Sequence, residues 1–143
     1  MIDALVDILV ATVAGGASVT FMHPLAEDAA RDFWDSSLAA ALRGERIVFG
    51  ALDGEALVGT VTLILQCPPN QPHRAEIAKL MTRPSHRGRG IGTALMHAAE
   101  AAAAGRGKTL IVLDTAADGG ASTLYEALGY NLAGVIPDYA FKP

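Results

Sequence analysis

The feature that most constrains the fold is a strand, loop, helix and strand pattern within residues 75–115. Residues 75–82 have the apolar character of a strand, which Pro84 ends, and residues 91–104 place apolar side chains at helical spacing. Residues 109–115 form a continuous apolar run, typical of a central parallel strand. Two strands joined by a helix predict a right-handed crossover with parallel strands, and hence an α/β unit.

The remaining sequence predicts further helices and strands around this unit. The predicted elements are helices at 2–14, 25–43, 91–104 and about 120–128, and strands at 47–52, 56–66, 75–82, 109–115 and within 130–141. The predicted buried side of the second helix holds Leu25, Ala29, Phe33, Leu38 and Leu42. Asp53-Gly54 is a strong hairpin signal between the first two strands. We therefore expect one domain over residues 1–143, with an α+β (α/β) fold and a mixed central sheet flanked by helices.

Composition excludes several classes of function. The 143 residues carry a formal net charge of -4, which argues against a nucleic-acid-binding surface. The single cysteine, Cys67, excludes an internal disulfide framework and fits a reducing cytoplasm, and four scattered histidines do not suggest a metal site. No apolar run approaches the roughly 18–20 residues that a membrane span needs, and the N-terminus lacks the basic region of a signal peptide. We expect a cytoplasmic protein without metal, nucleic-acid or membrane partners.

The loop between the strand at 75–82 and the helix at 91–104 is glycine-rich. Backbone N–H groups at a helix N-terminus are unpaired and favour phosphate oxygens, and Gly88, Gly90 and Gly92 let a ligand approach the backbone. A nucleotide P-loop would end in Gly-Lys-Ser/Thr, and a dinucleotide fingerprint would space its glycines differently. The loop therefore predicts an anion site of another kind.

Two motifs carry a resemblance to a known superfamily. Arg87-x-x-Gly90-x-Gly92, after a strand that ends Leu80-Met81-Thr82-Arg83-Pro84, resembles the acetyl-CoA motif of the GNAT superfamily of N-acetyltransferases. Leu124-Tyr125-Glu126-Ala127-Leu128-Gly129-Tyr130 resembles the second motif of that superfamily. The resemblance covers residues 47 to 136. Segments 15–19, 70–76, 113–115 and 136–140 narrow it to the tabtoxin-resistance type of acetyltransferase.

The resemblance implies a site for acetyl-CoA as co-substrate, in a splay between the strands at 75–82 and 109–115. The backbone of Leu80, Met81 and Thr82 would pair with the pantetheine and the acetyl carbonyl. The pyrophosphate would lie on the loop formed by Arg87, Gly88, Arg89, Gly90, Ile91, Gly92 and Thr93. Asp118 stands where the superfamily often has an asparagine that contacts the cofactor.

The start of the chain departs from the superfamily pattern. GNAT domains usually open with a strand, whereas this chain begins directly in the predicted helix at 2–14. We therefore expect the first strand of the fold to be missing: either the chain start is shortened, or strand 47–52 lacks a neighbour and has an unpaired edge. Such an edge invites pairing with another subunit, which favours a homodimer.

Acetyl transfer to an amine needs a base for the amine and an acid for the leaving thiolate. By the resemblance, Tyr125 would be the acid; the alternative is that it only covers the core. Glu76 is a candidate base because it lies four residues before Leu80, on the same strand face by period two; the alternative is a solvated carboxylate. Asp114 ends an apolar strand, where a carboxylate needs a role, either as base or substrate contact or in structural pairing.

Three further residues are candidates for acceptor binding. His73 and His23 are predicted in loops on the acceptor side, opposite the pyrophosphate end. Trp34 is mostly a core residue by position and is also a candidate wall of the acceptor pocket. The sequence thus predicts an N-acetyltransferase for a primary amine of a small molecule, amino-acid-like or toxin-like. The alternatives are a protein or peptide N-acetyltransferase and a non-catalytic acetyl-CoA-binding domain.

Overall fold

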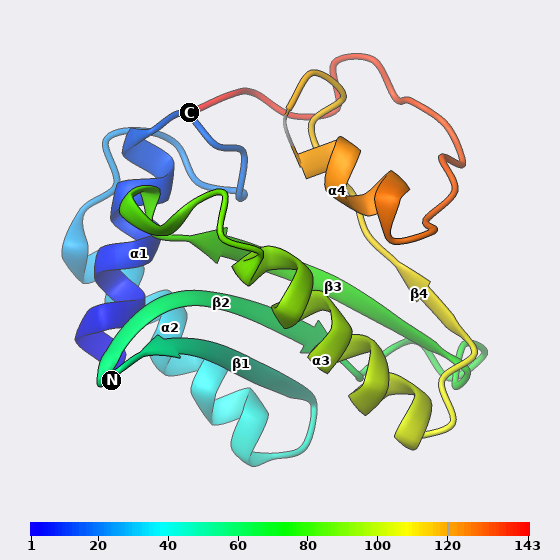
Figure 1. Cartoon of the computed structure of the whole chain (residues 1–143). Helices are drawn as coiled ribbons and strands as arrows, with labels where there is room; N and C mark the ends of the chain where they lie inside the picture. Colours follow the sequence, from blue (N-terminus) through cyan, green and yellow to red (C-terminus); the bar gives the residue numbers. More distant parts are fainter. Residues whose placement is uncertain (120) are drawn as a thin grey trace.

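The computed structural model describes residues 1–119 and 121–143. Figure 1 shows a twisted sheet with helices on both faces. The helices are α1 (Ile2–Ala14), α2 (Glu27–Leu42), α3 (Ile91–Gly105) and α4 (Ala121–Ala127), with a short 3₁₀ turn η1 at Pro84–His86. The strands are β1 (Arg46–Asp53), β2 (Ala56–Ile64), β3 (Arg74–Thr82) and β4 (Leu110–Val112). The α+β fold with a mixed sheet is confirmed, and these bounds lie close to the predicted ones except at β4.

The sheet has the order β1-β2-β3-β4, with β1, β2 and β3 antiparallel and β3 parallel to β4. A tight turn through Gly54, at φ 61°, joins β1 and β2, as the Asp53-Gly54 signal predicts. Among the described residues β1 pairs only with β2, so its outer edge is free of a neighbouring strand, in agreement with the sequence.

The parallel pair is short. Only Arg74, Ala75 and Glu76 of β3 pair with β4, although β3 continues to Thr82. The predicted strand at 109–115 is therefore wrong in length, and its expected central position is wrong too, because β4 lies at the sheet edge. Figure 1 shows β4 leading away from β3 toward α4. The two strands therefore part in the direction of the glycine loop.

Each face of the sheet has its own core. On one face α1 and α2 pack over Leu57 of β2 and Met81 of β3. On the other face α3 and Tyr125 of α4 pack over Val61, Leu63, Ala75 and Ile77. Strict alternation would put Leu57 on the same face as Val61 and Leu63, and Met81 on the same face as Ala75 and Ile77. Register shifts in the β1–β2 and β2–β3 pairs interrupt that alternation, so each strand contributes to both cores.

Helix α2 is rotated relative to the predicted orientation. Its buried residues are Ala30, Trp34, Ser37 and Ala40, which follow helical spacing. Ala29 is exposed and Leu42 is 91% exposed, so the predicted buried side is wrong at both positions. The fully buried Trp34 indole sets the rotation, because its Nε1 donates to the backbone oxygen of Leu5 in α1 at 3.0 Å.

The C-terminal tail contains no strand within residues 130–143, so the prediction of one or two short strands there is wrong. A strand requires a partner for its backbone groups, and β4, the nearest edge, offers only three residues. Instead the tail loops around α4 (Figure 1). The large apolar side chains that it exposes are Leu132, Val135, Ile136, Tyr139 and Phe141. None of the described helices is long and apolar enough to span a membrane.

Candidate functional site

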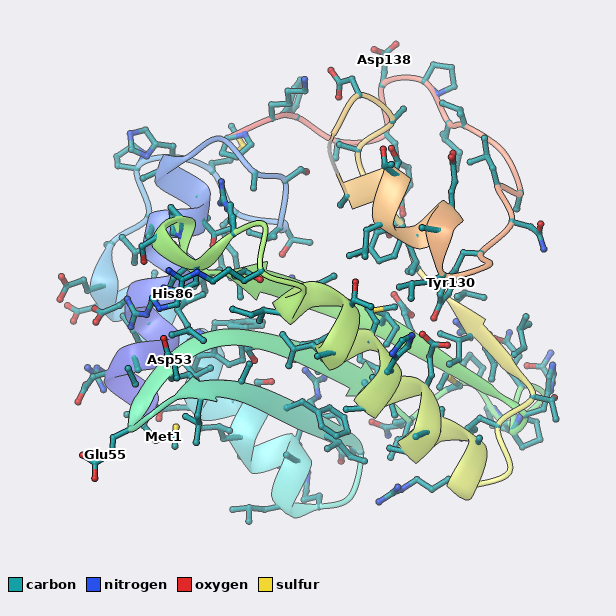
Figure 2. All side chains as sticks on the ribbon, viewed as in Figure 1. Met1, Asp53, Glu55, His86, Tyr130 and Asp138 are labelled. Carbon is teal, nitrogen blue, oxygen red and sulfur yellow. The ribbon has the colours of Figure 1, made fainter. Side chains whose placement is uncertain are left out.

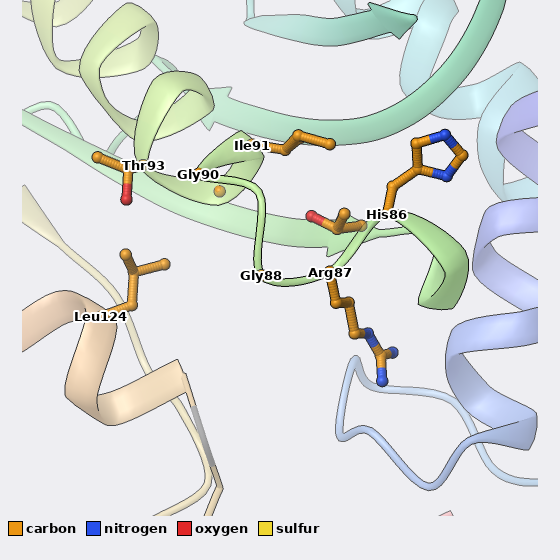
Figure 3. Close-up of a pocket in the computed structure, with 9 residues that line it drawn as sticks. His86, Arg87, Gly88, Gly90, Ile91, Thr93 and Leu124 are labelled. Carbon is orange, nitrogen blue, oxygen red and sulfur yellow. The ribbon is translucent and has the colours of Figure 1, made fainter.

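The glycine loop forms one wall of a cavity of about 200 Å³ between β3, α3 and α4 (Figure 3). Its lining residues are Thr82, His86, Arg87, Gly88, Gly90, Ile91, Gly92, Thr93 and Leu124. The structure thus brings together most of the residues predicted to hold a pyrophosphate. It adds His86 from η1 and Leu124 from α4, which are not among the residues predicted to bind the cofactor.

Backbone conformation suits this loop to an anion. Gly88 and Gly90 take φ of 75° and 78°, in the left-handed region that favours glycine, and Gly90 is the N-cap of α3. Within the described part of the chain, no backbone oxygen accepts from the N–H groups of residues 88–93. Free N–H groups and the positive end of the α3 dipole therefore meet at the cavity.

The two arginines of the loop take different directions. Figure 3 shows the Arg87 side chain extending from the cavity wall toward the segment that follows α1. Arg89 turns behind the loop, where its Nη1 lies 3.8 Å from Asp53 Oδ2. His86 Nε2 also lies 3.3 Å from that oxygen (Figure 2). Asp53 thus connects the back of the loop to the β1–β2 hairpin, and Arg89 is not among the residues that line the glycine-loop cavity.

A β-bulge interrupts β3 next to the predicted acetyl-binding segment. Lys79 takes φ 54°, and the β2–β3 register shifts between Thr60 and Thr62. Ile77 and Leu80, three residues apart, consequently both contact the core on the α3 face. The prediction that Glu76 and Leu80 share a face by period two is therefore wrong, because the extra residue at 79 resets the alternation.

The backbone from Ile77 to Thr82 has hydrogen-bonding groups available on the β4 side. Within the described residues, β4 pairs with β3 only as far as Glu76, whereas β2 pairs with Met81 and Thr82 on the opposite side. The Met81 side chain is 3% exposed, so its backbone rather than its side chain faces the gap. An extended ligand could therefore add to this edge of β3 beside the glycine-loop cavity.

Tyr125 lies across this gap on α4. Its ring packs edge-to-face on Tyr130 at 5.9 Å between centroids and belongs to the core on the α3 face. Burial raises the pKa of its hydroxyl, and the Asp114 carboxylate raises it further. Asp114 itself is exposed, so the prediction of a carboxylate at the end of a buried strand is wrong, because β4 already ends at Val112.

The sequence does not single out Lys79, because it is one of three charged residues in β3, with Arg74 and Glu76. Its Nζ donates to Thr20 Oγ1 at 2.8 Å and lies 5.7 Å and 5.3 Å from the ring centroids of Phe21 and Phe33. Burial lowers the pKa of its ammonium, and Asp114 opposes that effect. The bulge therefore places a half-buried cation where β3 and the α1–α2 segment meet.

The other candidate residues are dispersed. His73 lies just before the first residue of β3, beside the paired part of β3 and β4. Its carbonyl accepts from the N–H groups of Thr109 and Leu110. Glu76 also lies there, with Oε2 3.6 Å from Arg74 Nη1. The remaining placements are His23, exposed between α1 and α2, and Asp118, paired with Lys142 of the tail.

Trp34 has no surface for an acceptor. Its side chain is 0% exposed and lies between α1 and α2. A residue without accessible surface cannot wall a pocket, so the prediction of an acceptor contact there is wrong. Trp34 is a core residue.

Comparisons with known proteins agree with this geometry. Residues 14–130 match the family described as the acetyltransferase (GNAT) family. A GCN5-related N-acetyltransferase from Ralstonia eutropha is 28% identical, with a TM-score of 0.71 over 94% of this chain and 89% of that one. The Salmonella typhimurium protein yncA, solved with its cofactor acetyl-CoA, is 20% identical, with a TM-score of 0.80 over 98% and 79% of the two chains. An N-acetyltransferase from Staphylococcus aureus, 21% identical with a TM-score of 0.79 over 93% and 79% of the chains, shares the same fold.

Proposed function

Because the chain belongs to the acetyltransferase (GNAT) family, we propose that it transfers the acetyl group of acetyl-CoA to a primary amine of a small molecule. The observation that carries the proposal is that a free strand edge, the glycine-loop cavity and Tyr125 lie next to one another. The free edge of β3 from Ile77 to Thr82 leads directly to the glycine-loop cavity, and Tyr125 lies on the helix that closes the other side. An elongated ligand with a pyrophosphate at one end and a thioester at the other fits this arrangement.

The loop and the strand edge hold acetyl-CoA in this proposal. N–H groups of residues 88–93 bind the pyrophosphate, with Arg87 beside them, and the backbone of Leu80, Met81 and Thr82 pairs with the pantetheine and the acetyl carbonyl. A backbone N–H aimed at that carbonyl favours the negative charge that develops on its oxygen during acyl transfer. Asp118 is the weakest member of the set, since Lys142 already pairs with it.

The acetyl transfer itself requires the movement of two protons. The neutral amine attacks the thioester carbon, the C–N bond forms, the C–S bond breaks, and the amine loses a proton while the CoA thiolate gains one. A free alkylamine is almost entirely protonated near neutral pH, so an acceptor for its proton is needed. Asp114, exposed and within electrostatic reach of Tyr125, fills that role directly or through water. Tyr125 stays protonated because its pKa is raised, and it supplies the proton to sulfur.

Glu76 is the less favourable base. It lies where β3 and β4 are still hydrogen-bonded, beside Arg74, and not on the free edge. His73 lies at the same end of β3, just before Arg74. An acceptor pocket near His23 and the α1–α2 segment is therefore favoured over one near His73.

The proposal also covers the domain, the subtype, the cellular location, the acceptor and the oligomeric state. We infer one catalytic domain over residues 1–143, of the tabtoxin-resistance type and located in the cytoplasm, which acts on an amino-acid-like or toxin-like amine. The free outer edge of β1 supports a homodimer, since unpaired strand edges favour pairing with another chain.

The experiment that tests the proposal measures binding and turnover separately. Acetyl-CoA should protect the protein against thermal unfolding, whereas NAD and ATP at equal concentration should not. A panel of small amines should then release free CoA thiol at a rate proportional to enzyme concentration. Protection without thiol release from any amine or peptide would favour a non-catalytic acetyl-CoA-binding domain. Release with peptides alone would indicate a peptide N-acetyltransferase.

A further inference from the structure

Lys79 holds a half-buried ammonium group that makes no ion pair with a carboxylate among the described residues. The Nζ atom donates to the Thr20 hydroxyl at 2.8 Å and faces the rings of Phe21 and Phe33. An ammonium has three N–H donors, and a hydroxyl with two aromatic faces provides only one hydrogen-bond acceptor. The cation therefore has donors left for a further ligand.

Both partners of this hydrogen bond have a strained backbone conformation. Thr20 takes φ 76° and Lys79 takes φ 54°, and the only other non-glycine residue at positive φ in the described chain is Asp138. Such conformations cost about 1–3 kcal/mol each and concentrate at functional sites. Two strained residues from distant parts of the chain thus meet through their side chains.

Lys79 lies in β3 directly before Leu80, the first residue of the segment proposed to pair with the pantetheine and the acetyl carbonyl. Asp114 and Glu76 raise the pKa of the ammonium, and Arg46 and burial lower it. Asp114 also acts on Tyr125 from its exposed position after β4. The Asp114 carboxylate is therefore within electrostatic reach of both the proposed acid and Lys79. A molecule in this gap would meet an anion and a cation at separate points.

We propose that Lys79 is a specificity-determining residue that binds a carboxylate of the acceptor, so that the enzyme prefers amines that carry a carboxylate. Thr20 orients the ammonium, and the Phe21 and Phe33 rings exclude water from its other side. The acceptor's amine then lies toward Asp114 and the thioester. This inference rests on the proposed acetyl transfer and names the substrate class for it.

The test compares amino acids with the amines that their decarboxylation gives. The pairs are L-lysine with cadaverine, L-ornithine with putrescine, and L-phenylalanine with phenethylamine, and initial rates are followed by release of CoA thiol. The wild-type protein should show a higher kcat/KM for the amino acid of a productive pair. Lys79→Met should lower that value about 10-fold to 100-fold, through KM, because one charge-assisted hydrogen bond is lost. The loss for the decarboxylated amine should be much smaller, because that amine offers no carboxylate to Lys79.

Three further variants separate recognition from structure. Lys79→Arg should restore part of the preference, and Lys79→Gln replaces Lys79→Met in the comparison where the methionine variant does not fold. Arg106→Met, at the end of α3, removes a positive charge far from the gap and should change neither rate.

The outcomes distinguish the inference from the function on which it rests. Equal wild-type rates within every productive pair, or equal losses for both members in Lys79→Met, would overturn carboxylate recognition and leave acetyl transfer standing. Thermal protection by acetyl-CoA with no thiol release from any pair would overturn the proposed transfer to small amines, and the role of Lys79 with it.

Discussion

Gly92 in the first turn of α3 faces Leu124 of α4 so closely that a Cβ at position 92 would lie 3.3 Å from Leu124 Cδ2. This contact sets the approach of the two helices on either side of the glycine-loop cavity, and Figure 3 shows Leu124 opposite the start of α3. The third glycine of the motif therefore serves helix packing, whereas Gly88 and Gly90 serve the loop conformation.

Gly92→Val should weaken acetyl-CoA binding. The larger side chain pushes Leu124 and α4 away, and overpacking of this kind typically costs about 1–3 kcal/mol. Calorimetric titration should give a Kd for acetyl-CoA raised by about tenfold or more. Gly105→Val is the matched control, because nothing lies within 4 Å of a Cβ at position 105 and its φ is not positive. A Kd raised equally in both variants would contradict this role for the Gly92–Leu124 contact.

Gly90→Ala should reduce both stability and acetyl-CoA affinity. A left-handed conformation costs an L-residue about 1–2 kcal/mol, and the new methyl group would stand at the cavity wall. Gly54→Ala, at φ 61° in the β1–β2 turn, carries similar strain far from the cavity. Both variants should unfold at a lower temperature, and only Gly90→Ala should bind acetyl-CoA more weakly. Unchanged affinity in Gly90→Ala would argue against phosphate binding at the loop.

Tyr125→Phe should lower kcat by about 10²-fold or more, the usual range for loss of general acid catalysis. Acetyl-CoA binding should be nearly unchanged, because the ring and its packing on Tyr130 are retained. A general acid is active below its pKa, and burial raises the pKa of Tyr125 above the ordinary value of about 10. Ionisation of Tyr125 should therefore cause no loss of rate below about pH 10. Tyr139→Phe, at 68% exposure on the tail, is the control. Equal turnover in the two variants would remove Tyr125 from the proton transfer.

Local sequence signals predicted most of the elements, while features that depend on pairing partners were missed. Hydrophobic spacing and the Asp53-Gly54 turn gave the positions of α1, α3 and the β1–β2 hairpin, because these signals act over a few neighbouring residues. The length of β4 and the irregular tail depend on which edge offers backbone partners, and no local pattern carries that information.

The site shows the same division. The sequence predicts the loop because a left-handed backbone conformation at a helix start favours glycine, and glycine is visible in the sequence. The bulge at Lys79 has no such sequence signal, because an extra residue in β3 can be recognised only from how β3 pairs with β2. For this reason the sequence does not indicate a role for Lys79, and period two predicts that Glu76 and Leu80 share a face, which they do not.

The rotation of α2 leads to a stability prediction. Trp34→Phe removes the indole N–H bond to Leu5 and leaves a void in the core, which should lower the free energy of unfolding by roughly 1–3 kcal/mol. The KM for the amine should stay the same, since Trp34 has no exposed surface. Leu42→Ala should change stability by less than about 0.5 kcal/mol, because that side chain is 91% exposed. Denaturant unfolding measures both variants, and a larger loss at Leu42 would restore the orientation predicted from the sequence.

Tyr130 should make the fold sensitive to alkali. Its hydroxyl is buried without a partner among the described residues, and burial, Glu100 and Tyr125 raise its pKa to about 12. In the unfolded chain the same group ionises near pH 10. Its contribution to stability is therefore complete below about pH 10 and is lost as the pH rises toward 12. Tyr130→Phe should accordingly show a shallower fall of Tm between about pH 9.5 and 11 than the wild-type protein. Tyr139→Phe, exposed on the tail, should follow the wild-type curve, and a wild-type slope in Tyr130→Phe would place the alkaline loss elsewhere.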